Sequence, residues 1–335
     1  MNYKKVVILG SNSFAGANFV KRALSEGYQV LGFNRSIESH LMFLPYNNSV
    51  NKKNYKFIQA DINKNFNDII ENINIFKPNV IIDFLGQGMV AESWKNPIQW
   101  YTTNLISKIK LIEELKLNTW LEKYIRVSTP EVYGSSENLL LETSRYNPST
   151  PYAISHTAID MNLAIYFQQY NFPVIINRFA NFYGPGQQLY RIIPRTIIYA
   201  LMKKKLKLDG GGKSIRAFIY ADDVSDAIIK TINAGKIGEI YHFSPNSFIS
   251  IRELVEKICI KMNIEFNSFV EIVNDRPGKD HAYLMDSKKS RVELFWNDNI
   301  SIDDGINHTY AWIKQNINDI KNLSLDYEHK PQLLI

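Results

Sequence analysis

Near its start the chain has an apolar strand, a glycine turn and an amphipathic helix. The strand reads KVVILG (5–10), the turn SNSFAG and the helix ANFVKRALSEG. This order is typical of the first unit of a dinucleotide-binding fold, in which Gly10 permits the tight turn and Gly16 lets the helix pack close to the strand. An ordinary βα turn is the alternative, but the strand before the glycines and the helix after them favour nucleotide binding.

Five more apolar strands follow, and helical patterns separate them. They read YQVLGFNRS, NYKFIQA, NVIIDF, KYIRVS and FPVIINR. This alternation predicts an α/β fold with a doubly wound parallel sheet of the Rossmann type. We expect the dinucleotide-binding domain to span residues 1–177, with a segment near 221–243 returning a strand to it. Residues 178–220 and 244–335 are expected to form a smaller α/β region that binds substrate.

The composition excludes several classes of protein. Hydrophobic residues make up 45% and charged residues 21% of the 335 residues, as is ordinary for a soluble globular enzyme. No apolar run approaches the roughly 20 residues that cross a bilayer, so we expect no membrane partner. The single cysteine, Cys259, cannot form an intrachain disulfide, and we expect a cytoplasmic protein. The net charge of +6 is scattered along the chain, which fits small anionic ligands and no nucleic acid.

Residues 127–156 bring together the side chains that can carry chemistry. A strand ends just before Thr129 and Glu131, and a helix begins near Tyr152 and His156. Residues four apart project from one helical face, so this phenol and this imidazole are offered to the same cleft. A tyrosine with a pKa near 10 is a poor base at neutral pH, but a neighbouring cation and hydroxyl groups can lower that pKa. We interpret the segment as a reaction centre.

The sequences T-P-E-V-Y-G and Y-x-x-x-H in this segment resemble those of the extended short-chain dehydrogenase/reductases that act on nucleotide sugars. Members of that family carry a Thr or Ser, a Y-x-x-x-K pair and, in the 4,6-dehydratases, a T-[D/S]-E-x-Y-G turn. This chain matches in frame and departs at Pro130 and His156. The resemblance covers roughly residues 5–295. It implies four catalytic residues, namely Thr129, Glu131, Tyr152 and His156.

The resemblance also implies a site for NADP or NAD. Its residues would be Gly10, Ser13, Phe14, Gly16, Asn34, Arg35, Asp61, Ile62, Gly86, Tyr152 and His156. Ser13 stands where the family pattern has glycine, and Asp61 has an alternative role as the cap of the next helix. The second strand ends at Asn34-Arg35, and a basic residue there can meet the 2′-phosphate of NADP, whereas an acidic one favours NAD. We therefore favour NADP, with a merely solvated arginine as the alternative.

The later part of the chain would bind a nucleotide-diphosphate sugar. Asn181 matches the asparagine of the family segment R-x-x-N-x-Y-G-P that touches the diphosphate, and Arg216 and Arg276 match phosphate-binding arginines. A guanidinium offers phosphate a fork of donors, although two surface ion pairs would explain the same residues. A further family arginine is replaced here by Ala282. Asn104 matches an asparagine that supports the active-site helix, unless it is simply an exposed polar residue.

The implied activity is that of a 4,6-dehydratase, which forms a 4-keto-6-deoxy sugar nucleotide for surface polysaccharide. Tyr152 would remove the C4 hydroxyl proton, Thr129 would hold that oxygen, and Glu131 would take the C5 proton. The alternatives are a nucleotide-sugar epimerase or uronic-acid decarboxylase of the same family, and a non-catalytic nucleotide-binding subunit. Pro130 favours these alternatives, because it cannot protonate the leaving hydroxyl.

His156 departs from the family at a position with two tasks. The family lysine holds the nicotinamide ribose and lowers the pKa of the tyrosine with a fixed positive charge. An imidazole has a reference pKa near 6.5 and is mostly neutral at pH 7, although it can still donate one hydrogen bond. We expect slow turnover unless local contacts keep His156 charged.

Further expectations concern the wider architecture. Residues 98–115 should form one helix, and residues 206–223 a hairpin. Family members usually dimerise through helices like those at 98–116 and 152–170, so a homodimer is expected. We expect no metal site.

Overall fold

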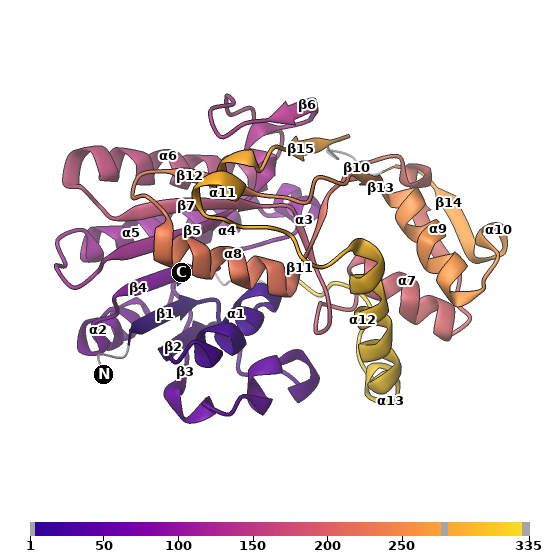
Figure 1. Cartoon of the computed structure of the whole chain (residues 1–335), viewed down its shortest axis with the longest axis horizontal. Coiled ribbons are helices and arrows are strands. Elements are labelled where there is room, and N and C mark those ends of the chain that lie inside the picture. Colours follow the sequence, from indigo (N-terminus) through magenta and orange to yellow (C-terminus); the bar gives the residue numbers. More distant parts are fainter. Residues whose placement is uncertain (1–3, 276–280, 330–335) are drawn as a thin grey trace.

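The central sheet of the computed structural model has seven strands (Figure 1), and the structure describes residues 4–275 and 281–329. The strand order is β12-β7-β5-β4-β1-β2-β3, and every neighbouring pair is parallel. The strand bounds are β1 Lys5–Leu9, β2 Gln29–Asn34, β3 Tyr55–Gln59, β4 Val80–Asp83, β5 Lys123–Ser128, β7 Val174–Phe179 and β12 Ile240–Phe243. The returning strand expected near the end of 221–243 is β12, whose Ile240 pairs with Ile176.

Helices cover both faces of this sheet (Figure 1). One layer contains α1 Phe14–Ser25 and α8 Ala221–Ala234, and the other contains α2 Phe66–Phe76, α5 Ser107–Leu115 and α6 Pro151–Tyr170. Along β1, Val6 and Ile8 belong to the first layer and Val7 and Leu9 to the second, which is the two-residue period of a strand. Each such buried side chain stabilises the fold by about 1.5–3 kcal/mol. The predicted doubly wound sheet is confirmed.

The strand order reverses at β1. This strand has β2 on one side and β4 on the other, so the chain leaves β1 and β4 toward opposite faces of the sheet. In open α/β sheets the crevice at such a switch point, outside the carboxyl ends of the strands, is where ligands bind. The fold therefore places a candidate site beside the glycine turn that follows β1.

The helix expected at 98–115 is interrupted. A short helix, α4 (Pro97–Tyr101), runs into a π-helical turn at Thr102–Ile106, and α5 begins only after it. At this turn the Asn104 side chain is fully buried and bonds to two other segments. Single π turns within helices are frequent at functional sites.

The rest of the chain forms a second region beside the sheet, at the right of Figure 1. Its helices α7 Ile192–Leu201, α9 Ile251–Met262 and α12 Ile302–Gln315 share an apolar core. Its shorter helices are α10 Phe266–Phe269, next to α9, and α13 Ile317–Ile320, next to α12. Two further short helices lie with the sheet instead, α3 Val90–Lys95 against α6 and α11 Lys288–Glu293 against β12 (Figure 1). Within residues 4–275 and 281–329, no helix has both the length and the apolar composition that a membrane span requires.

The hairpin expected at 206–223 does not form. Strand β9 (Leu206–Asp209) pairs with β14 (Val270–Val273), and β10 (Ile215–Arg216) pairs with β13 (Ile249–Ser250). The three glycines between β9 and β10 all have positive φ, and their turn leads the chain away from β9. Two further pairs are β8 Asn181–Tyr183 with β11 Phe218–Tyr220, and β6 Ser136–Leu140 with β15 Tyr283–Met285.

Candidate active site

The predicted glycine turn joins β1 to α1. Gly10 has a φ of +81°, in the region that favours glycine, and its N–H donates to the Phe33 carbonyl oxygen at 2.8 Å. A Cβ on Gly16 would lie 2.2 Å from the Gly10 oxygen, so a larger residue would push α1 away from β1. Ser13 caps α1, and its hydroxyl oxygen accepts the Gly16 N–H at 3.0 Å. The serine that replaces a family glycine thus holds the turn together.

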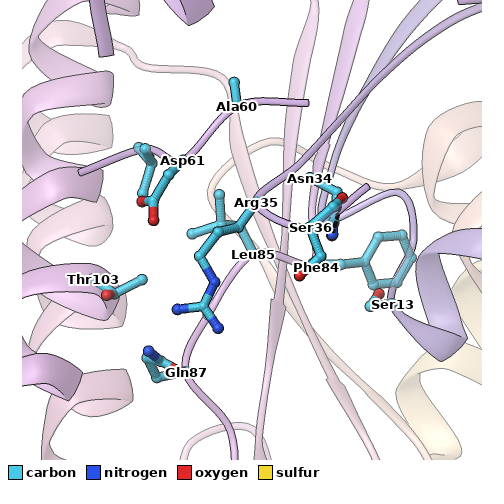
Figure 2. A pocket seen from close by; sticks show the side chains of 13 residues that line it. Ser13, Asn34, Arg35, Ser36, Ala60, Asp61, Phe84, Leu85, Gln87 and Thr103 are labelled. Carbon is cyan, nitrogen blue, oxygen red and sulfur yellow. Dashed lines mark hydrogen bonds between the residues drawn. The ribbon is translucent and has the colours of Figure 1, made fainter. Parts of the chain in front are cut away.

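A pocket opens at the carboxyl ends of β1 to β4, beside this turn (Figure 2). Seven predicted cofactor residues line it, namely Gly10, Ser13, Asn34, Arg35, Asp61, Ile62 and Gly86. Four others do not line it. Phe14 and Gly16 are buried in the first turn of α1, where they pack against the protein core and the Gly10 carbonyl, and Tyr152 and His156 lie on α6. The sequence analysis missed several lining residues, which are Ser36, Ala60, Phe84, Leu85, Gln87 and Thr103.

Arg35 extends into the middle of this pocket. Figure 2 shows its guanidinium directed toward Gln87 and Thr103, with Asp61 on the same side. The Asp61 carboxylate accepts the Asn63 N–H at 2.9 Å and does not cap the next helix, since the capping position of α2 belongs to Asn65. Arg35 and Asp61 therefore form one wall of the predicted dinucleotide pocket.

The predicted catalytic residues Thr129, Glu131 and Tyr152 come together. Thr129 follows β5 and begins a short 3-10 turn, Pro130–Tyr133, where its hydroxyl oxygen accepts the Glu131 N–H at 3.3 Å. The Tyr152 phenol, at the start of α6, is close enough to the Thr129 side chain for Thr129 to act on its pKa. Burial and then the Glu131 charge raise the pKa of Tyr152 above its usual 10, while the Thr129 bond and Arg126 oppose that rise. A phenol, a hydroxyl and a carboxylate thus meet at one place.

His156 lies one turn below Tyr152 on α6. The two ring centroids are 4.5 Å apart, and the Nη2 of Arg126 lies 2.9 Å from the Nδ1 of His156. Burial, Arg126 and Lys108 together lower the pKa of His156 well below 6.5. The local contacts therefore keep His156 neutral, and the fixed charge of the family lysine does not come from this residue.

The turn that carries Glu131 is anchored through Tyr133. Its hydroxyl accepts a hydrogen bond from Arg178 and donates one to the Nε2 of His242 at 2.8 Å. The Nδ1 of His242 faces the Asp286 carbonyl oxygen at 3.2 Å, and a carbonyl only accepts, so the proton of this ring is on Nδ1. Burial and then Arg178 lower the pKa of His242 to about 3. This buried chain of contacts fixes the turn against β7 and β12.

Asn104 connects the cofactor pocket to α6. Its side-chain oxygen accepts the Gln87 N–H at 2.7 Å, and its amide donates to the Gln87 carbonyl oxygen at 3.1 Å and to Ser155 Oγ at 3.0 Å. A Cβ on Gly86 would approach the Asn104 oxygen to 3.1 Å. Asn104 is therefore not an exposed polar residue, and it ties the helix of Tyr152 to the pocket wall.

The predicted substrate residues Asn181 and Arg216 lie around Tyr283. Asn181 accepts a hydrogen bond from the Tyr283 hydroxyl at 3.2 Å, and the Arg216 guanidinium lies over the Tyr283 ring at 4.2 Å. Arg216 is 8% exposed, and its Nη1 donates to the carbonyl oxygens of Ile215 and His281, so it is a buried residue and not a solvated surface arginine. Arg276, the third predicted substrate residue, lies outside the described residues.

Two members of the site were missed in the sequence. Tyr283 contributes to the electrostatic surroundings of Tyr152 as well as contacting Asn181 and Arg216. Arg126 contacts His156 from β5. Arg126 left a signal in the sequence, since it is a charged residue inside the apolar strand KYIRVS.

This sheet, with a pocket at its switch point and a Thr–Glu–Tyr centre beside it, defines an extended short-chain dehydrogenase/reductase. Within that class the chain belongs to the GDP-mannose 4,6 dehydratase family, whose sequence model matches residues 7–309. The chain is also similar to dTDP-D-glucose 4,6-dehydratase of Homo sapiens. The two are 30% identical over 337 residues, which cover 98% of this chain and 95% of the human protein.

Two solved dTDP-glucose 4,6-dehydratases have the same fold. The Bacillus anthracis structure superposes with a TM-score of 0.84 at 28% identity, and the Streptomyces venezuelae structure with a TM-score of 0.86 at 25% identity. Each superposition covers 94% of this chain and 98% of the other. Both structures contain NAD, so the preference for NADP that we inferred from Arg35 gains no support from them.

Proposed function

We propose that this protein is a nucleotide-sugar 4,6-dehydratase, which converts its substrate to a 4-keto-6-deoxy sugar nucleotide by removing one water. The observation that carries the proposal is the position of Tyr152 beside the turn of Thr129 and Glu131, whose side chains both act on the pKa of its phenol. The human relative and the two structural neighbours, all named dTDP-glucose 4,6-dehydratases, support it.

Each of the three residues has one task in the reaction. Tyr152 takes the proton of the C4 hydroxyl, and Thr129 holds that oxygen through its own hydroxyl. The resulting C4 ketone acidifies C5, and Glu131 takes the C5 proton so that the C6 hydroxyl group can be eliminated. A nicotinamide bound in the neighbouring pocket would supply the hydride chemistry that links C4 to C6. C5 would then take one proton from water, and Tyr152 would release the proton that it took from the C4 hydroxyl.

Pro130 gives Glu131 a second task. Pro130 is buried and has no proton to give, so it cannot protonate the leaving C6 hydroxyl. Glu131 becomes a carboxylic acid once it holds the C5 proton. We propose that it passes this same proton to the C6 hydroxyl, which leaves as water and returns Glu131 to its starting state.

The cofactor and the substrate occupy neighbouring sites. We propose NAD in the pocket lined by Gly10 and Arg35, as in the neighbours, and a nucleotide-diphosphate sugar held by Asn181, Arg216 and Arg276. The domain boundaries expected from the sequence, 1–177 with a return near 221–243, would separate these two sites. We further propose a cytoplasmic homodimer that makes surface-polysaccharide precursors.

The test is mass spectrometry of GDP-, dTDP-, UDP- and CDP-sugars, each incubated with the purified protein and NAD or NADP. We expect one sugar nucleotide to lose the mass of one water, and Tyr152→Phe to abolish this loss. Loss of carbon dioxide would instead identify a uronic-acid decarboxylase. An unchanged mass with altered sugar stereochemistry in the NMR spectrum would identify an epimerase, and an unchanged substrate would contradict catalysis.

A further inference from the structure

Five charged side chains are buried where α5 and α6 pack against the sheet. Each has a side chain at most 1% exposed, and they are Asp83, Lys108, Arg126, Asp160 and Arg178. Three of them are basic and two are acidic. A buried charge costs several kcal/mol unless it is paired, so a cluster with a surplus of basic groups is an expensive arrangement to place under a helix. The reaction proposed above uses none of these residues.

Arg126 lies at the centre of this cluster. Its Nη1 is 3.4 Å from the Asp83 carboxylate, and its Nε is 3.7 Å from the Asp160 carboxylate. The remaining nitrogen, Nη2, lies 2.9 Å from the Nδ1 of His156. Two carboxylates from different elements therefore hold the guanidinium so that its third nitrogen meets the imidazole.

This contact determines the tautomer of His156. An arginine only donates hydrogen bonds, so the Nδ1 of His156 must carry a lone pair. The ring is neutral, because burial and the nearby cations Arg126 and Lys108 lower its pKa. Its single proton is therefore on Nε2. His156 can donate one hydrogen bond from Nε2, but it carries no positive charge.

We propose that Arg126 and His156 divide two tasks that a lysine performs in the related enzymes. The Arg126 guanidinium supplies the positive charge that stabilises ionised Tyr152, and its hydrogen bond to Nδ1 fixes His156 as an Nε2–H donor for the cofactor. Arg126 is thus a positioning residue, which touches neither substrate nor cofactor. This inference rests on the proposed role of Tyr152 as the base.

The surroundings of Tyr152 agree with this division. Burial, Glu131 and Tyr283 raise the pKa of Tyr152, whereas the hydrogen bond with Thr129 and the charge of Arg126 lower it. Of these five influences on the pKa of Tyr152, Arg126 is the one that comes from a positive charge. Because the carboxylate of Glu131 opposes ionisation of the phenol, a compensating positive charge has a clear physical purpose.

Lys108 is less suited to that purpose. Its Nζ is bound to the Asp83 carboxylate at 2.6 Å, and burial followed by Arg126 lowers its pKa to about 7. An ammonium with this pKa loses its charge near neutral pH. A guanidinium stays charged at any pH that a protein tolerates, so Arg126 can act on Tyr152 throughout the working range.

The first test needs no substrate. In the full-length protein, 15N NMR of labelled histidine, assigned with His156→Gln, should show a neutral Nε2–H ring from about pH 8 down to about pH 5.5, below the reference pKa. In Arg126→Lys the charge remains but the hydrogen-bond geometry changes, so the Nδ1 signal should move. Protonation of His156 near pH 6.5 in the unmodified protein, or an Nδ1–H tautomer, would overturn the assignment.

The second test is the pH dependence of kcat. Arg126→Gln should lower kcat at neutral pH about tenfold or more and move its acid limb about one unit or more to higher pH, with KM nearly unchanged, because less of the phenol is ionised. Lys123→Gln is the matched control. Lys123 lies on the same strand, and its ammonium donates to carbonyl oxygens at the other end, including Ile232 and Gly235. Lys123→Gln also removes one positive charge from this strand, but it should leave the acid limb of kcat in place.

A rescue experiment separates charge from packing. His156→Lys in the Arg126→Gln background returns one cation to the site and should restore the acid limb, whereas His156→Lys alone places a second cation beside Arg126 and should destabilise the protein. An unshifted acid limb in a folded Arg126→Gln enzyme would refute the charge role while the dehydratase stands. If no sugar nucleotide reacts, the proposed function fails, and the NMR experiment still decides the tautomer.

Discussion

At the scale of single residues, the negative charge of Glu131 acts against the ionisation of Tyr152. In the proposed reaction Tyr152 must be ionised before it can take the C4 hydroxyl proton, and the Glu131 charge opposes this ionisation by raising the pKa of the phenol. Glu131 then takes the C5 proton. Glu131→Gln removes that charge and also the base for C5. We expect this variant to oxidise C4 but not to eliminate water, so that one equivalent of reduced nicotinamide accumulates per active site.

Absorbance of the reduced nicotinamide and the mass of the sugar nucleotide measure these two stages separately. Tyr152→Phe is the control, because it should show neither reduced cofactor nor loss of water. Continued elimination by Glu131→Gln at more than about a hundredth of the original rate would show that another group takes the C5 proton, since a positioned base typically contributes 10²–10⁴-fold.

Arg35 makes a second prediction at this scale. Its guanidinium lies in the dinucleotide pocket, where the 2′-phosphate of NADP could meet it (Figure 2). A charge-assisted hydrogen bond contributes about 1.5–3 kcal/mol, so Arg35→Ala should weaken NADP binding about tenfold or more relative to NAD. Calorimetric titration of both cofactors measures this ratio, with exposed Lys56→Ala as the control. An unchanged ratio would mean that Arg35 does not contact the phosphate.

At the scale of secondary-structure elements, the buried His242 links acid stability to the catalytic turn. Its pKa is lowered to about 3, so below pH 6.5 the unfolded chain binds a proton that the folded protein does not. The stability is present above pH 6.5 and is lost as pH falls toward 3. We expect a loss of about 2 kcal/mol from this residue between about pH 8 and about pH 5.

Urea unfolding across that range measures the dependence. His156, whose pKa is also lowered, acts in the same direction, so the comparison must isolate His242. His242→Gln should be less stable at pH 8 but should show a shallower fall toward pH 5. Parallel curves for the two proteins would indicate that His242 titrates alike in the folded and unfolded states.

The last described segment makes a prediction about two other elements. Asp326 pairs with Arg195 of α7 at 2.9 Å, and His329 stacks on Trp100 of α4 with centroids 5.5 Å apart and planes 13° apart. The segment therefore bridges the two regions of the molecule. An aromatic stack contributes about 0.5–1.5 kcal/mol, so His329→Ala should lower the melting temperature by a few degrees and shift tryptophan emission to the red.

The control for this prediction is Asp326→Asn. Its carboxylate side chain is 77% exposed, and an exposed ion pair contributes about 0–1 kcal/mol, so little change is expected. If both variants behave alike, the stack on Trp100 contributes no more than the surface pair.

The elements also show what the sequence could and could not predict. Apolar runs identified the strands of the central sheet, because most of these strands are buried on both faces and their composition reflects that burial. The edge strand β3 still has an apolar pattern, although its Lys56 and Gln59 are exposed. The π turn at Asn104 depends on bonds to Gln87 and Ser155, which are distant in sequence, and no local pattern encodes it. The expected hairpin failed for the same reason, since the partner of β9 lies about sixty residues further on.

The same limit applies to the candidate site. The motif residues of the turn and of α6 were predictable because a short sequence holds them together. The role of Arg126 was not predictable, although its charge within an apolar strand stood out, since that role depends on two carboxylates from β4 and α6 that only the fold brings to it. The neutral state of His156 follows from that arrangement and not from the residue type.

At the scale of the whole molecule, no part of residues 4–275 and 281–329 covers the outer face of α6. Its inner face, including Ile159 and Leu163, packs against the sheet, yet Ile154, Met161 and Ile165 are 43%, 52% and 58% exposed. These three lie on one helical stripe, and a helix that is apolar on all sides is expected to be buried. We expect two copies to pair through this stripe and the adjoining α5, which would bury it in a four-helix arrangement.

Sedimentation velocity should therefore find a dimer at micromolar concentration, and Ile165→Glu should convert it to a monomer because a charge would enter the apolar contact. Ile260→Glu is the matched control, since Ile260 is 79% exposed on α9 in the other region. Because α6 also carries Tyr152 and His156, the monomer should lose activity as well as mass. A monomeric wild-type protein would mean that the exposed stripe meets a different partner, and an active monomeric variant would show that pairing is not needed to hold the reaction centre.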